Sequence, residues 1–152
     1  FLMILLSRRS LLAIAAVVDI AMHARPSPVA AKHLAVRHNL PPRHLETMLQ
    51  TMVRAGILKG VRGPRGGYEI AKERRRITAG DIVRAAMAST GEDSMPPVPE
   101  SRLVEDVVGP MVRHAGSSFL RELDAVTVDD LCRKAETRNV FNDTTATADF
   151  TI

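Results

Sequence analysis

The spacing of apolar residues predicts three helices in the first third of the chain. Ser7 can cap a first helix that is apolar over most of its circumference, so we expect this helix to be buried. A second helix over 30–38 brings Leu34 and Val36 toward the core, and the Asn39-Leu40-Pro41 break ends it. The pattern therefore favours a small helical core.

The third predicted helix starts at Pro41 and Pro42 and ends near Gly56. Apolar residues at offsets of three, four, seven and eight form one buried stripe: Leu45, Met48, Leu49, Met52 and Val53. The opposite face is polar and consists of Arg43, Thr47, Gln50 and Arg54, flanked by His44 and Glu46. All of these side chains can hydrogen-bond to phosphates or to base edges.

Two short strands, 57–62 and 68–71, follow this helix and predict a β-hairpin. The glycines of the 63–67 turn permit positive φ angles, and Arg62 and Arg65 extend from it. Such arginines suit a DNA minor groove, where the negative potential is concentrated. A phosphate-cradling loop is the rival interpretation, but this turn opens no helix and lacks the Walker lysine.

The second half of the chain is predicted to be helical as well. A capping box at Thr78–Asp81 starts a helix that buries Ile82, Val83, Ala86 and Met87. After a polar linker, Ser101 caps a short helix, and Gly109-Pro110 marks a break before the next one. The last short helix is capped by Thr127–Asp130.

The apolar side of the helices after residue 101 needs a covering surface. Self-association into a symmetric homodimer is the economical solution, and packing back onto the first helix is the alternative. The expected organisation is a DNA-binding domain, a linker, dimerisation helices and a disordered tail, over 4–88, 89–100, 101–137 and 138–152.

Composition and charge narrow the class of protein. Aromatic residues make up 3% and Trp is absent, which favours a mostly α fold with a small β-hairpin. Residues 1–84 hold fifteen basic and five acidic residues, whereas 85–152 hold six and twelve. A basic first half suits a polyanion such as double-stranded DNA. Arg74–Arg76 is either a further phosphate contact or a solvated loop.

Four segments together resemble the Rrf2 family of bacterial transcription regulators. They are Leu45-Glu46 with Arg54-Ala-Gly-Ile-Leu58, Val61-Arg-Gly-Pro-Arg-Gly-Gly-Tyr68, Ile77-Thr-Ala-Gly-Asp-Ile-Val83 and Val126-Thr-Val-Asp-Asp-Leu131. The resemblance covers roughly residues 4–135, and the hairpin motif is its most specific part.

The resemblance implies a winged helix-turn-helix homodimer, with a long C-terminal helix that crosses to the partner and a pseudo-palindromic operator. It implies that Arg43, His44, Glu46 and Thr47 contact the bases and backbone of DNA, and that Arg62 enters the minor groove. It also implies that Ser7, Arg8 and Arg9 contact DNA phosphates. Such a protein is a sequence-specific regulator, more often a repressor.

The chain departs from the family in its cysteines. Many members hold an iron-sulfur cluster on three cysteines of the linker, but the 91–101 segment has none, so we expect no cluster and no other cofactor. The single Cys132 is a candidate redox thiol, although a lone cysteine beside Leu131 is more often a small buried hydrophobe. The signal that such a protein senses, a ligand or a partner protein, stays open.

Other functions find less support in the sequence. The five histidines show no metal-binding spacing, so we predict no metal site. An enzyme would have to rely on Ser117-Ser118 near His114, and an adaptor protein with vestigial DNA binding would use the acidic half. The first helix resembles a twin-arginine export signal, but Asp19 interrupts its apolar run. We expect a cytoplasmic protein with no membrane contact.

Overall fold

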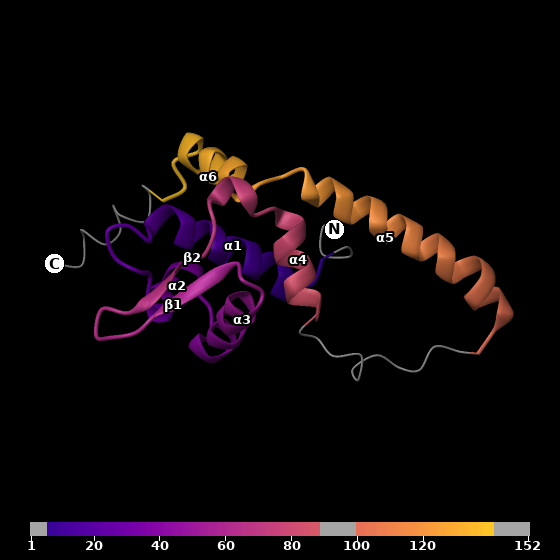
Figure 1. Ribbon diagram of the computed structural model, residues 1–152, viewed down its shortest axis with the longest axis horizontal. Helices are drawn as coiled ribbons and strands as arrows, with labels where there is room; N and C mark the ends of the chain where they lie inside the picture. The colour runs from indigo at the N-terminus through magenta and orange to yellow at the C-terminus, as the bar shows by residue number, and fades with distance from the viewer. Residues whose placement is uncertain (1–5, 89–99, 142–152) are drawn as a thin grey trace.

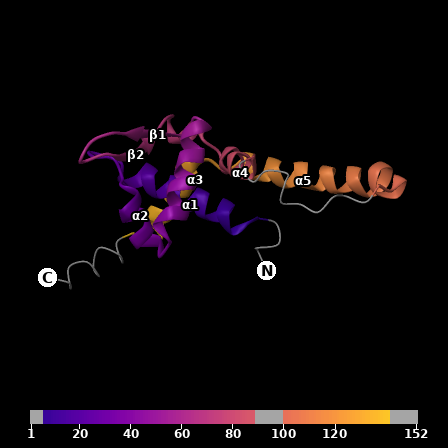
Figure 2. The ribbon, with the colours of Figure 1, turned by 90° about the horizontal axis from the view of Figure 1, so that it is seen from below.

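The computed structural model describes residues 6–88 and 100–141 (Figure 1). Seven segments form the body: α1 (Arg8–His23), α2 (Ala31–His38), α3 (Pro42–Arg54), β1 (Leu58–Val61), β2 (Gly67–Ile70), η2 (Arg74–Arg76) and α4 (Ala79–Ala88). A long helix made of η4 (Val104–Val108) and α5 (Gly109–Asp124) projects away from this body, and α6 (Val128–Thr137) returns to it (Figures 1 and 2). The expected class, mostly α with a small hairpin, is confirmed.

Helix α1 is the centre of the core. It packs against α3, α4, α6 and β2, and its Val17 and Ile20 have no exposed surface. The predicted stripe of α3 faces this core, because Leu45, Met48, Leu49 and Met52 are at most 4% exposed, while Val53 is partly buried.

The expected helix signals operate at the start of α1, at the end of α2 and at both ends of α3. The Ser7 hydroxyl accepts a hydrogen bond from the Ser10 backbone N–H at 3.2 Å, which caps α1. Asn39 ends α2 in the left-handed conformation, with φ of 52°. Pro42 lies in the first turn of α3, and Gly56 follows it with φ of 76°.

The hairpin is a two-stranded antiparallel sheet, as predicted. Leu58 pairs with Ile70, and Val61 pairs with Gly67 at the turn. A further backbone bridge joins Tyr68 to Val29, which precedes α2. The hairpin is therefore fastened to the segment that leads into the helix-turn-helix.

Helices α4 and α6 start side by side through two equivalent capping boxes. The Thr78 hydroxyl accepts from the Asp81 N–H at 3.0 Å, and the Thr127 hydroxyl accepts from the Asp130 N–H at 3.0 Å. Thr78 and Thr127 also form an antiparallel backbone bridge. Both predicted caps are confirmed.

A bidentate ion pair joins α4 to the end of α5. Arg84 donates to both carboxylate oxygens of Asp124, at 2.5 and 2.8 Å. This hydrogen bonding lowers the pKa of Asp124. A lowered folded-state pKa means that the pair stabilises the fold at neutral pH, and that this contribution is lost as pH falls through the lowered value.

The expected break at Gly109-Pro110 is wrong, because the helix runs through it. Proline lacks an N–H and its ring clashes with the carbonyl four residues earlier, so a regular helix would be disturbed there. The wider π-helical turn η4 accommodates Pro110, and the Gly109 N–H donates to the Val104 carbonyl five residues back. Two predicted helices are one continuous helix as a result.

Two residues assigned to the core are exposed instead. Val36 is 81% exposed and Met87 is 55% exposed. Val36 lies about 200° around the helix from Leu34. Because α2 is buried on one side only, through Leu34 and Ala35, Val36 points to solvent. Met87 lies in the last turn of α4, next to the buried Ala86.

Packing back onto α1 does not cover the apolar side of the long helix. Its first half presents four large apolar side chains that are 57–62% exposed: Leu103, Val107, Met111 and Val112. The part nearer the body, from Ser118 to Leu120, is partly buried.

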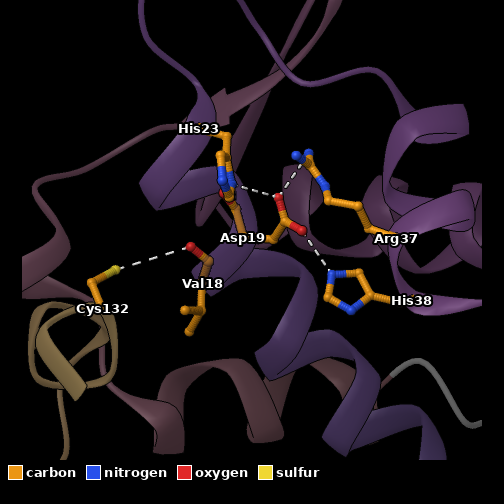
Figure 3. A network of polar contacts seen from close by, with 6 residues as sticks. All are labelled: Val18, Asp19, His23, Arg37, His38 and Cys132. Atoms are coloured by element: carbon orange, nitrogen blue, oxygen red, sulfur yellow. Dashed lines mark hydrogen bonds and ion pairs between the residues drawn. The ribbon is translucent and has the colours of Figure 1, made fainter. Parts of the chain in front are cut away.

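A buried carboxylate attaches α2 to α1 (Figure 3). Asp19 has no exposed surface and lies 3.0 Å from His23 Nδ1, 3.0 Å from an Arg37 guanidinium nitrogen and 2.7 Å from His38 Nε2. The sequence indicated only that Asp19 interrupts an apolar run. In the structure it is the point where the two helices meet.

We predict that Asp19→Asn lowers the free energy of unfolding by roughly 3 kcal/mol, because the buried charge-assisted hydrogen bonds are lost. Urea unfolding measures this. The matched control is Asp106→Asn, whose carboxylate lies 3.8 Å from Arg102 and is 63% exposed. The control should change stability by less than about 0.5 kcal/mol, and equal effects of the two variants would contradict a structural role for Asp19.

Candidate nucleic-acid interface

The polar face of α3 is fully presented to solvent. All six residues predicted for it are exposed: Arg43, His44, Glu46, Thr47, Gln50 and Arg54. Because the opposite side of α3 is packed on the core and on α2, this face is held rigidly. The Thr47 hydroxyl donates to the Arg43 carbonyl at 3.2 Å and keeps its acceptor lone pairs.

The hairpin lies next to this face. The Gln50 amide is 3.5 Å from the Tyr68 hydroxyl, which links α3 to β2. A shallow hollow of about 320 Å³ separates the two elements, and Arg62 lines it. Arg62 and Arg65 are both exposed, and neither forms an ion pair within the part of the chain that the structure describes. The α3 face and Arg62 thus border the same hollow.

Ser7, Arg8 and Arg9 stand at the first turn of α1. The Ser7 hydroxyl is engaged in the cap, Arg8 is exposed and Arg9 is half-buried. The hairpin lies near the other end of α1, where Ile20 and Ala21 line a surface hollow together with Ile70 of β2. The sixteen residues of α1 span about 24 Å, so Ser7, Arg8 and Arg9 are separate from the hairpin.

The basic run Arg74–Arg76 has a structural role that the sequence did not indicate. Arg74 Nε donates to Asp129 at 2.8 Å, and Arg75 Nε lies 3.9 Å from the same carboxylate. Arg133 approaches it at 3.0 Å. The run therefore ties η2 to α6, and Arg76 is its only member without an ion pair in the described ranges. A contact 55 residues apart has no local sequence signal.

Cys132 is completely buried on α6. Burial raises the pKa of its thiol, and its Sγ lies 4.0 Å from the Val18 carbonyl of α1. Reactive thiols have lowered pKa values and are accessible, so this environment favours the buried-hydrophobe interpretation over the redox one. Within residues 6–88 and 100–141, no three His, Cys, Asp or Glu side chains are arranged to hold a metal ion.

The enzyme alternative finds no geometric support at Ser117-Ser118. His114 and Ser117 are exposed on α5, and the Ser118 hydroxyl accepts from the Arg121 guanidinium at 3.0 Å. No helix in the described ranges is long and apolar enough to cross a membrane.

The arrangement of α2, a short turn, α3 and a hairpin defines a winged helix-turn-helix protein. Residues 6–134 match the Rrf2 family, described as iron-dependent transcriptional regulators. The chain is 34% identical over 131 residues to the Synechocystis HTH-type transcriptional regulator slr0846, covering 83% of this chain and 86% of that protein.

Solved structures agree with this match. IscR of T. potens superposes with a TM-score of 0.68 at 28% identity, covering 88% of this chain and 89% of that one. CymR, the global cysteine regulator of B. subtilis, superposes with a TM-score of 0.62 at 25% identity, covering 85% and 96%. The chain belongs to the Rrf2 family of transcriptional regulators.

We predict that Gly67→Ala disturbs the attachment of the hairpin, because a Cβ at this position would meet the Val29 carbonyl oxygen. Backbone must move to relieve the clash, at a cost of roughly 1–3 kcal/mol in urea unfolding. Gly60→Ala is the matched control on the paired strand, since nothing lies within 4 Å of its Cβ. Faster amide exchange at Tyr68 should accompany only the Gly67 variant; its absence would argue against the attachment.

Proposed function

We propose that the protein is a sequence-specific DNA-binding transcription regulator that binds a pseudo-palindromic operator as a homodimer. The observation that carries the proposal is the surface that the exposed α3 face shares with Arg62 of the hairpin. A protein helix fits the major groove, and arginine is favoured in a narrow minor groove beside it. One continuous protein surface can therefore contact both grooves.

The side chains of this surface have the chemistry that base and phosphate contacts need. Arg43 can donate to guanine or to a phosphate, Gln50 can pair with adenine, and Glu46 can accept from cytosine N4. Arg62 reaches the minor groove from the hairpin. Ser7 and Arg8, at the separate end of α1, would contact the backbone of the same duplex.

The long helix supports the homodimer. It projects away from the body (Figure 2). Its apolar residues near Val107 and Met111 are mostly exposed. A second copy of the same helix would cover them and would set two α3 helices on one duplex. Binding over a promoter then represses by occlusion.

Signal sensing in this protein is proposed to be independent of an iron-sulfur cluster. The family description names iron, and cluster ligation needs several cysteine thiolates. The chain has one cysteine, and that one is fully buried on α6. The residues present therefore do not fit a cysteine-held cluster.

We predict that selection of bound genomic DNA enriches an inverted repeat, and that Arg62→Ala weakens binding to it roughly tenfold. The magnitude of the slope of log K against log salt should fall by about one, because one counterion-releasing positive charge is lost from the interface. Arg102→Ala removes an equal charge from the long helix, where Arg102 is 95% exposed, and should change neither quantity. Failure to enrich any sequence at low salt would exclude the function and leave the adaptor alternative.

We predict that the double variant Val107→Glu/Met111→Glu is monomeric, with a dimer dissociation constant raised at least about a hundredfold, because two charges would be buried in the interface. Sedimentation equilibrium measures this, and circular dichroism checks that the helix persists. Val36→Glu is the control, since it adds a charge at an exposed valine of α2, away from the long helix. A dimeric double variant would contradict this interface.

A further inference from the structure

A second hollow, of about 900 Å³, lies on the body away from the α3 face. The end of α1, the turn after it, the base of the hairpin, residues 71–75 and Asp129 of α6 surround it. No residue of α3 lines it. We call it the α1–hairpin hollow. Its volume is in the range of small-molecule sites, which commonly lie where several elements meet.

One wall of the α1–hairpin hollow is apolar. Ile20, Ala21 and Ala24 come from α1 and its end, and Ile70 comes from β2. Ile20 is fully buried and the other three are partly buried. An apolar body would gain burial against this wall.

The other walls are basic. Five cations and three carboxylates line the hollow. Lys59 is paired with Glu69 at 3.3 Å, and Asp129 already accepts from Arg74. Arg25 and Lys72 form no ion pair among the described residues, and both are exposed at the hollow. Two unpaired cations beside an apolar wall are complementary to an organic anion. Glu73 is the one lining carboxylate without an ion pair among the described residues, and the lining stays net positive with it included.

We propose that the α1–hairpin hollow binds a small organic anion with an apolar body, which acts as the effector of the regulator. This rests on the proposed DNA-binding function. The anion's charged group lies between Arg25 and Lys72, and its apolar part lies against Ile70 and Ala24.

The position of the hollow links ligand binding to DNA binding. Its walls include β1, β2 and η2, so an occupant contacts the base of the hairpin that carries Arg62. An added negative charge in the basic half also weakens the attraction for phosphates. Operator affinity therefore falls when the hollow is filled, and by linkage operator DNA lowers the affinity for the anion.

The test uses the full chain with anilinonaphthalene sulfonate, an aromatic anion, as the probe. Fluorescence titration should show saturable binding, with the uncharged phenylnaphthylamine binding about tenfold more weakly. Amide chemical-shift changes should centre on Ala24 and Ala71. The double variant Arg25→Glu/Lys72→Glu should weaken sulfonate binding about tenfold and leave the uncharged probe unchanged.

The matched control is Arg102→Glu/Arg138→Glu, which makes the same change in charge at exposed positions outside the hollow. Shifts centred on Leu103–Val112, or equal weakening by both double variants, would overturn the site. If operator DNA changes the amide chemical shifts of Arg25 and Lys72 while the probe does not bind, these cations belong to the DNA interface and the proposal is wrong.

The effector role is tested separately on the selected operator. Saturating probe should weaken operator binding at least about threefold. An unchanged operator affinity with the probe bound would overturn the effector role and leave the DNA-binding function standing. Absence of operator binding without any probe would instead overturn the proposed function.

Discussion

The placement of the helix-turn-helix depends on one buried carboxylate. Transferring Asp19 out of water costs several kcal/mol, so the site is favourable only because good donors meet it. His23 comes from its own helix, whereas Arg37 and His38 come from the last turn of α2. These contacts fix where α2 ends. Since α3 begins after a turn of only three residues, its polar face is set by the same contacts.

A second set of contacts fixes the long helix. The Ala79 N–H donates to the Val126 carbonyl and the Val128 N–H donates to the Ile77 carbonyl, both at 2.8 Å. These bonds place the starts of α4 and α6 together, and the Arg84–Asp124 pair then holds the end of α5 on α4. A Cβ at Gly80 would meet the Asp124 carboxylate, so this close approach requires glycine. The direction in which the apolar side of the long helix projects is thereby defined.

Local signals were sufficient for most of the fold. The helix caps and the apolar stripe of α3 depend on residues within one or two helical turns of each other. The sequence predicted all of them, including the caps at Ser7, Thr78 and Thr127. The exposed α3 face followed from the same periodicity. The same Thr-x-x-Asp pattern stands at the starts of α4 and α6. The sequence does not show that these two starts are neighbours, whereas the backbone bridge between Thr78 and Thr127 does.

The features that could not be predicted from the sequence depend on contacts between residues far apart in the chain. Arg74 looked like a DNA contact or a solvated residue because Asp129 lies 55 positions away. Asp19 looked like an interruption because its partners Arg37 and His38 lie on another helix. The break at Pro110 was wrong for a different reason: a π-helical turn accommodates a proline that an α-helix does not.

These distant contacts make the end of α1 the junction between α3 and the hairpin, the two elements of the proposed DNA interface. Asp19 connects it to Arg37 and His38 of α2, and through α2 to α3. The Val29 bridge connects the segment after it to the hairpin. A displacement at this end would therefore move α3 and Arg62 relative to each other. In the proposed complex, contact with both grooves requires a fixed spacing between these two elements. The proposed ligand in the neighbouring hollow would therefore need no contact with DNA to change operator affinity.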